Sequence, residues 1–128
     1  MTTRETNPAD WFLLASERLR AADALFGSLG STWSGIELLH EAVERYLKGW
    51  LIGKGWTLVK THDLQHLMAE AVARDPAFNA FMSLAIDLTD RFFAQHYPGD
   101  DLTDVETHYP ELRRQTDGLL RLIRGDSP

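Results

Sequence analysis

The sequence contains no cysteine and no apolar run long enough to cross a bilayer. Without cysteine, the chain has neither a disulfide framework nor a thiolate metal site. A transmembrane helix needs about 18 or more consecutive apolar residues, which no segment provides. The first residues also lack the apolar stretch and the small-residue cleavage site of a secretory signal. We therefore expect a cytoplasmic protein that does not enter a membrane.

Positive charge is also scarce. Thirteen lysines and arginines stand against nineteen acidic residues, which gives a formal net charge of -6 at pH 7. Such a chain repels nucleic acid at long range, so non-specific coating of DNA is excluded. Salt screens surface fields beyond about 10 Å at 0.1 M, however. A local basic cleft, or a seam between two copies, can therefore still bind a polyanion.

The length of 128 residues is that of one domain, and we expect a single domain over residues 1–128 with its core at about 7–124. Apolar residues recur every three or four positions in five segments, whereas no segment shows the sustained alternation typical of a strand. These patterns predict an all-α protein, built as an up-and-down bundle of four to five helices.

Capping residues predict where the first two helices begin and end. Asn7-Pro8 combines a capping side chain with a proline suited to the first helical position, and glycines within 27–30 end that helix. Ser31 or Thr32 can cap the second helix, whose apolar residues continue until Gly53. The second helix has the strongest periodicity in the chain.

The remaining helices are predicted from prolines and caps in the same way. Thr61 begins a short third helix that stops before Asp75-Pro76, because a residue ahead of proline avoids helical geometry. The fourth helix runs from there until the segment 97–99, Tyr-Pro-Gly, breaks it. Pro110 is expected in the first turn of the last helix, which ends near Gly125.

Arg91 and His96 are the best candidates for chemistry. A guanidinium is always charged and can hold a phosphate through paired hydrogen bonds, and an imidazole titrates near neutral pH and can move a proton. In a continuous α-helix, residues five positions apart point about 140° away from each other. The two side chains can share a face only where the helix unwinds, and Tyr97-Pro98-Gly99 supplies that break.

Four segments, in this order, carry a family resemblance: Trp11 in the first helix, 41–48, Lys60-Thr61-His62-Asp63-Leu64, and 91–99. The residues at the helix boundaries are the most specific part of this resemblance. The chain resembles the HEPN superfamily, in particular the domains of HEPN/minimal nucleotidyltransferase toxin–antitoxin systems. The resemblance covers most of the chain and implies a helical bundle that pairs as a homodimer.

In catalytic members of this family, an arginine followed after four to six residues by a histidine forms a metal-independent ribonuclease site. Arg91 and His96, with four residues between them, match that motif. The resemblance thus implies a toxin that cleaves RNA without a cofactor, through a composite site at the dimer interface. Tyr97 is expected to stack on a base, and Lys60 to contact a phosphate at the start of the third helix.

Two other interpretations stay open. Phe92 stands where catalytic members have a small polar residue, so the domain could instead be a non-catalytic nucleotide- or RNA-binding module that partners a minimal nucleotidyltransferase. Alternatively, Arg91 pairs with Asp87 or Asp90 on its own helix, and His96 only caps the helix end.

Glu44 and Lys48, four apart, are interpreted as an ordinary stabilising pair. The arginines of the last helix are interpreted as a solvated face rather than a nucleic-acid groove.

Two sets of side chains have spacings known from metal sites. One resembles half of a di-iron bundle site with two further acids: Glu37 with His40, Asp63 with His66, and Glu17 and Asp87. In the other, His62 and His66 lie four apart with Glu70 in the same row, a spacing able to bind zinc if another ligand approaches. The first set need not converge, and the second fits a solvated face, so we predict no metal site.

Overall fold

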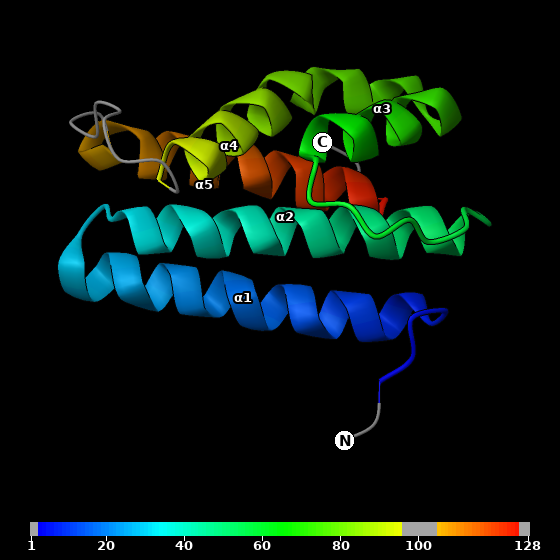
Figure 1. Ribbon diagram of the computed structural model, residues 1–128, viewed down its shortest axis with the longest axis horizontal. Coiled ribbons are helices and arrows are strands. Elements are labelled where there is room, and N and C mark those ends of the chain that lie inside the picture. Colours follow the sequence, from blue (N-terminus) through cyan, green and yellow to red (C-terminus); the bar gives the residue numbers. More distant parts are fainter. Residues whose placement is uncertain (1–2, 96–104, 126–128) are drawn as a thin grey trace.

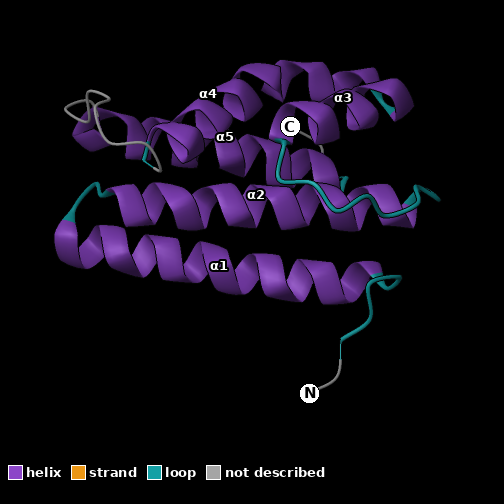
Figure 2. Ribbon diagram, in the orientation of Figure 1, coloured by secondary structure: helices purple, strands orange, loops and turns teal. Residues whose placement is uncertain are grey.

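The computed structural model describes residues 3–95 and 105–125 and, of residues 105–107, the main chain only. The elements follow in the order α1 (Pro8–Leu29), α2 (Trp33–Gly53), α3 (Leu64–Arg74), the 3-10 helix η1 (Pro76–Phe81), α4 (Met82–Ala94) and α5 (Val105–Arg124). Within these described ranges no strand occurs, as Figure 2 shows. The predicted all-α class is confirmed.

Helix α2 is the centre of the bundle. It contacts α1, α3, α4 and α5. In Figure 1, α1 runs alongside it on one side, and α3, α4 and α5 lie on the other. Because consecutive helices fold back on one another, the arrangement is the up-and-down bundle expected from the sequence.

The central position of α2 follows from its apolar face. Residues spaced by three and four positions fall on one side of a helix, and five such residues of α2 are fully buried: Ile36, Leu39, Val43, Leu47 and Leu51. The surrounding helices add their own buried leucines to the same core: Leu64, Leu67, Leu84, Leu88, Leu112 and Leu119. The apolar face of α2 packs against α3, α4 and α5, and this packing positions these three helices relative to α2.

Gly49 allows α1 and α2 to approach closely. A Cβ atom at this position would lie 2.8 Å from the ring of Phe12 and 3.0 Å from the Cβ of Trp11. Contacts that short do not occur between relaxed carbon atoms, so a side chain here would push α1 outward. The glycine is therefore required by packing, not by its backbone angles.

The predicted caps of the first two helices are confirmed. The side chain of Asn7 accepts a hydrogen bond from the main-chain nitrogen of Ala9 at 3.1 Å, and Pro8 follows it as predicted. Thr32 Oγ1 accepts from the nitrogen of Gly35 at 2.9 Å, which selects threonine over its serine neighbour as the cap. Gly30, with a positive φ of 73°, ends α1.

The predicted cap of the third helix was wrong by two residues. Asp63, not Thr61, is the N-cap of α3, and its Oδ1 accepts from the main-chain nitrogens of Gln65 at 3.0 Å and His66 at 3.3 Å. Thr61 instead accepts from the nitrogen of Asp63 at 3.1 Å. A carboxylate that reaches two N–H groups of the first turn, at the positive end of the helix dipole, is the stronger cap.

Two further boundaries differ from the prediction. Pro76–Phe81 forms a separate 3-10 helix before α4, because the main-chain nitrogen of Phe78 donates to the carbonyl of Asp75, a bond across three residues. Helix α5 begins at Val105, which places Pro110 inside the helix and not in its first turn. Proline there removes one main-chain hydrogen bond near the helix start.

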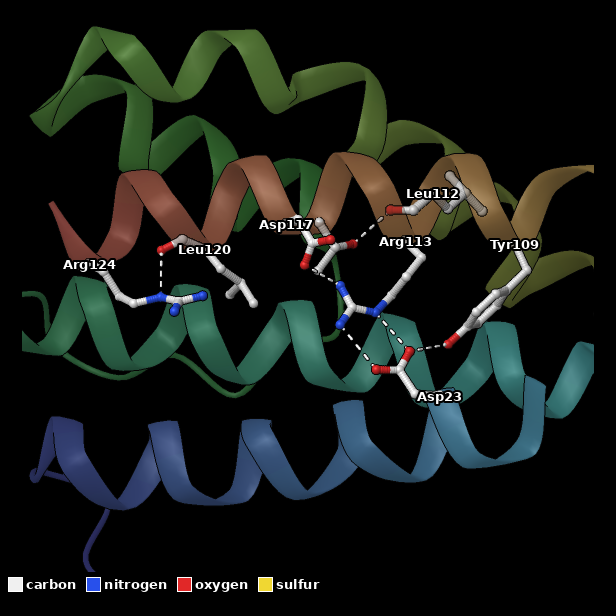
Figure 3. Close-up of polar contacts among 8 residues, drawn as sticks. Asp23, Tyr109, Leu112, Arg113, Asp117, Leu120 and Arg124 are labelled. Carbon is white, nitrogen blue, oxygen red and sulfur yellow. Dashed lines mark hydrogen bonds and ion pairs between the residues drawn. The ribbon is translucent and has the colours of Figure 1, made fainter. Parts of the chain in front are cut away.

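Helices α1 and α5 are joined by a polar network on the surface of α2, shown in Figure 3. Asp23 of α1 accepts from Arg113 Nε at 2.8 Å, from Arg113 Nη2 at 3.0 Å and from the Tyr109 hydroxyl at 3.1 Å. Arg113 also donates to Asp117 on its own helix. The hydrogen bonds from Arg113 lower the pKa of the Asp23 carboxyl, so Asp23 is ionised at neutral pH.

Candidate functional site

Arg91 lies in the last turn of α4 and is half-buried. Its Nη1 donates to the main-chain carbonyl of Asp87 at 3.2 Å, so this contact with Asp87 involves the backbone rather than the carboxylate. His96 and Tyr97, the other two residues predicted around it, lie outside the described residues. The guanidinium of Arg91 is therefore held against its own helix.

Phe92 holds this end of α4 against two other parts of the bundle. Its ring stacks on His40 of α2, with the ring centroids 4.5 Å apart and the planes at 20°. The ring of His62, just before α3, lies 6.5 Å away at 28°. These contacts fix the position of the residue that follows Arg91.

His40 is buried and neutral at physiological pH. Its side chain is 1% exposed, and burial lowers its pKa to about 4, although the charge of Glu44 acts in the opposite direction. Neither ring nitrogen has a hydrogen-bond partner among the described residues. His40 therefore serves the fold as an aromatic surface for Phe92.

Glu44 and Lys48 form the ion pair that their spacing predicted, and this pair is buried. Both side chains are buried, and Lys48 Nζ lies 3.0 Å from Glu44 Oε2. The second carboxylate oxygen, Oε1, lies 2.9 Å from Nδ1 of His62, whose side chain is 76% exposed. A buried carboxylate is stable only when it is paired and hydrogen-bonded, and here both of its oxygens have a partner.

Trp11 of α1 covers Lys48 and is itself held by the N-terminal segment. The indole nitrogen of Trp11 donates to the carbonyl of Glu5 at 2.8 Å, and the ring lies 5.6 Å from Lys48 Nζ, within range of a cation–π contact. These contacts fix the ammonium group between an aromatic face and the Glu44 carboxylate. Lys48 is therefore a positioned structural cation rather than a mobile surface lysine.

A cavity of about 310 Å³ opens beside this pair, lined by residues from the N-terminal segment, α1, α2 and the connection before α3: Glu5, Trp11, Glu44, Arg45, Lys48, Leu58, Lys60, Thr61 and His62. We call it the Glu44 pocket. Its three cationic side chains outnumber its two carboxylates, in a chain whose net charge is -6. The pocket is thus a local exception to the negative field of the molecule, as binding of an anion requires.

The structure places one of the predicted site residues, Lys60, in the Glu44 pocket. Lys60 is exposed and lines the Glu44 pocket with His62, next to the start of α3 where we expected a phosphate contact. Arg91 is not among the described residues that line this pocket. The link between the two is Phe92, which follows Arg91 and lies against His62.

Glu44 and His62 are the site residues that the sequence reasoning missed. One signal was present, because His40, Glu44 and Lys48 follow one another at intervals of four and so form a polar row along a helix that is otherwise apolar on that side. The partner of that row, His62, comes from beyond the end of α2. Helical spacing alone does not reveal it.

The metal sets considered from the sequence do not assemble. Nowhere in residues 3–95 and 105–125 do three or more metal-ligating side chains gather. His62 is turned to Glu44, and His40 is buried against Phe92. Both sets of spacings thus belong to side chains that serve other contacts.

A second cavity, of about 460 Å³, lies between α1, α2 and α5. Arg113 on its wall is held by Asp23 and Asp117, and the neighbouring Arg114 is held by Glu111. Two of the arginines that make the last helix basic are thus neutralised by carboxylates, in agreement with a solvated face. The other arginine that lines this cavity, Arg124, donates to the main-chain carbonyl of Leu120.

The fold and the site define a small helical domain with an arginine in the last turn of α4 and a pocket lined by three cationic side chains. The family model described as HEPN domain matches residues 9–120. The chain therefore belongs to the HEPN family, which confirms the resemblance seen in its motifs. It has no significant match among curated proteins or among solved structures. None of the described helices combines the length and the apolar character that crossing a membrane requires.

Proposed function

We propose that this HEPN domain is a metal-independent ribonuclease, the toxin of a toxin–antitoxin pair, which cleaves RNA with Arg91 and His96. The observation that carries the proposal is the placement of Arg91. It is half-buried in the last turn of α4, and its neighbour Phe92 packs against His62 at the cation-rich Glu44 pocket. The ribonuclease and nucleotide-binding roles known for HEPN domains support the same conclusion.

In this mechanism, His96 takes a proton from an RNA 2′-hydroxyl or gives one to the departing 5′-oxygen, and Arg91 neutralises the charge that grows on the phosphate. The products are a cyclic phosphate and a 5′-hydroxyl. Lys60, exposed at the pocket, binds a neighbouring phosphate, and Tyr97 stacks on a base. HEPN domains often form dimers, which supports a homodimer that brings two such sites to one groove.

The test is cleavage of a short labelled RNA, in the presence of EDTA, by purified protein and its variants. Arg91→Ala and His96→Ala should each lower turnover by about a hundredfold or more, because acid–base and electrostatic contributions have that size. Matched controls lie on α3: Arg74→Ala removes an exposed arginine that pairs with Glu70, and His66→Ala removes an exposed histidine. Cleavage that survives both site substitutions would contradict the proposal.

Phe92 favours a second candidate function. Its ring fills the space between His40 and His62, directly after Arg91, where catalytic members of the family have a small polar residue. The domain would then bind a nucleotide or RNA without cleaving it, together with a minimal nucleotidyltransferase. Expression in growing cells separates the two functions: a toxin arrests growth and Arg91→Ala relieves the arrest, whereas a binding module is harmless and co-purifies with its partner.

A further inference from the structure

The cavity of about 460 Å³ between α1, α2 and α5 has the size of a small-molecule site. Helices α1 and α5 both lie on α2, but among the described residues their main chains make no close contact with each other. The cavity occupies the space between them, and the bond of Asp23 to Arg113 bridges the two helices on its border. We call it the α1–α5 cavity.

Apolar and aromatic side chains form most of its wall: Phe12, Leu19, Tyr46, Leu120 and Ile123. Leu19 and Leu120 belong to the buried core, so this part of the wall is firmly packed. The rings of Phe12 and Tyr46 stack with their centroids 6.1 Å apart and their planes at 30°. A wall of this kind favours a flat, apolar ligand body that can contact ring faces and leucine side chains together.

The first arginine of the cavity, Arg113, is already engaged. All three of its guanidinium nitrogens donate to the carboxylates of Asp23 or Asp117. Two carboxylates around one guanidinium leave this part of the cavity with a formal charge of -1. A polyanion such as RNA would therefore be repelled here.

The second arginine, Arg124, has donors to spare. Its Nε donates to the carbonyl of Leu120 at 3.3 Å, and among the described residues its two Nη groups have no hydrogen-bond partner. Tyr46 lies within the field of both guanidiniums: burial raises the pKa of its hydroxyl, whereas the charges of Arg124 and Arg113 act in the opposite direction. The hydroxyl is protonated at neutral pH, so it can donate as Arg124 can. A carboxylate matches these donors, because guanidinium and carboxylate groups form paired, charge-assisted hydrogen bonds.

We propose that the α1–α5 cavity binds a small aromatic monocarboxylate, an activity separate from the proposed ribonuclease function. The aromatic body lies against Leu19 and Leu120, and the carboxylate accepts hydrogen bonds from the Nη groups of Arg124. One negative charge suits the cavity, because Arg113 is already neutralised and Asp117 opposes further anionic groups. A ligand in this position contacts both α1 and α5, so its binding stabilises the docked last helix.

The test is isothermal titration calorimetry of the purified full chain with 2-naphthoate. The matched ligand, 2-naphthamide, has the same rings without the charge. We expect 2-naphthoate to bind about tenfold or more tightly than the amide, and Arg124→Gln to remove this preference. Arg114→Gln should bind like the native chain, because Arg114 is an arginine of the same helix that pairs with Glu111 and does not line the cavity.

A further variant tests where the ligand lies. Ser16 lines the cavity, so Ser16→Phe should fill it and abolish binding, while circular dichroism shows that the bundle is intact. No binding of 2-naphthoate, equal affinity for the amide, or an unchanged Arg124→Gln would each overturn the proposal. Binding that survives in folded Ser16→Phe would also overturn it, because the ligand would lie elsewhere. RNA cleavage should be the same in Arg124→Gln and the native chain, so the two proposals stand or fall separately.

Discussion

Acidification should destabilise the bundle through His40. This residue lies in the middle of α2 with 1% of its side chain exposed, and burial lowers its pKa to about 4. In the unfolded chain a histidine titrates at its ordinary pKa of about 6.5. Between these two pKa values His40 is protonated in the unfolded chain and neutral in the folded protein, so lowering the pH favours unfolding.

The size of the effect follows from the two pKa values. The stability that depends on neutral His40 is complete above about pH 6.5 and falls as the pH approaches 4. A pKa difference of one corresponds to about 1.4 kcal/mol, so the whole interval corresponds to roughly 3 kcal/mol. About 2 kcal/mol of that is lost by pH 5. This is a large part of the stability of a typical domain.

Urea unfolding at pH 7.5, 6 and 5, followed by circular dichroism, measures this loss. His40→Phe keeps an aromatic ring against Phe92 without a titratable nitrogen, so its free energy of unfolding should fall by about 2 kcal/mol less than that of the native chain between pH 7.5 and 5. His66→Gln, which removes an exposed histidine, should follow the native chain. An equally steep fall for His40→Phe would refute a buried, neutral His40.

Two substitutions test the packing of α1. Gly49→Ala should lower the free energy of unfolding by about 1 kcal/mol, because the clash with Phe12 costs about 1–3 kcal/mol and the gain in helix propensity is only about 1 kcal/mol. A more stable variant in urea unfolding would show that the helices can separate at no cost. Asp23→Ala should cost about 1–3 kcal/mol, because it leaves the Tyr109 hydroxyl and one edge of Arg113 without their acceptor. Thermal unfolding should show a midpoint several degrees lower, and an unchanged midpoint would mean that the network contributes nothing.

The sequence predicted the helices best where the cause is local. Asn7 and Thr32 cap their helices through hydrogen bonds to residues two or three positions away, which residue type and spacing reveal directly. The 3-10 helix and the early start of α5 could not be predicted in this way. The apolar pattern of η1 suits either kind of helix, and Pro110 by itself favours a first-turn position.

The candidate site was predictable only in part, for a related reason. Arg91 and Lys60 were identified from residue type, position and family resemblance, and of these two Lys60 lines the Glu44 pocket whereas Arg91 does not. Glu44 was interpreted only as one half of a stabilising ion pair, because its burial depends on chain segments that lie outside α2. The contact with His62, 18 residues further on, forms only when the connection after α2 folds back over that helix.

The network of Asp23 with Arg113 spans 90 residues, whereas a turn of three residues separates α1 from α2. Contacts between distant parts of a chain carry the larger loop-closure entropy and form later than local ones. The hairpin of α1 and α2 can thus assemble while the remaining helices are still being synthesised. The final helix then docks onto a surface that already exists, and its arrival closes the bundle.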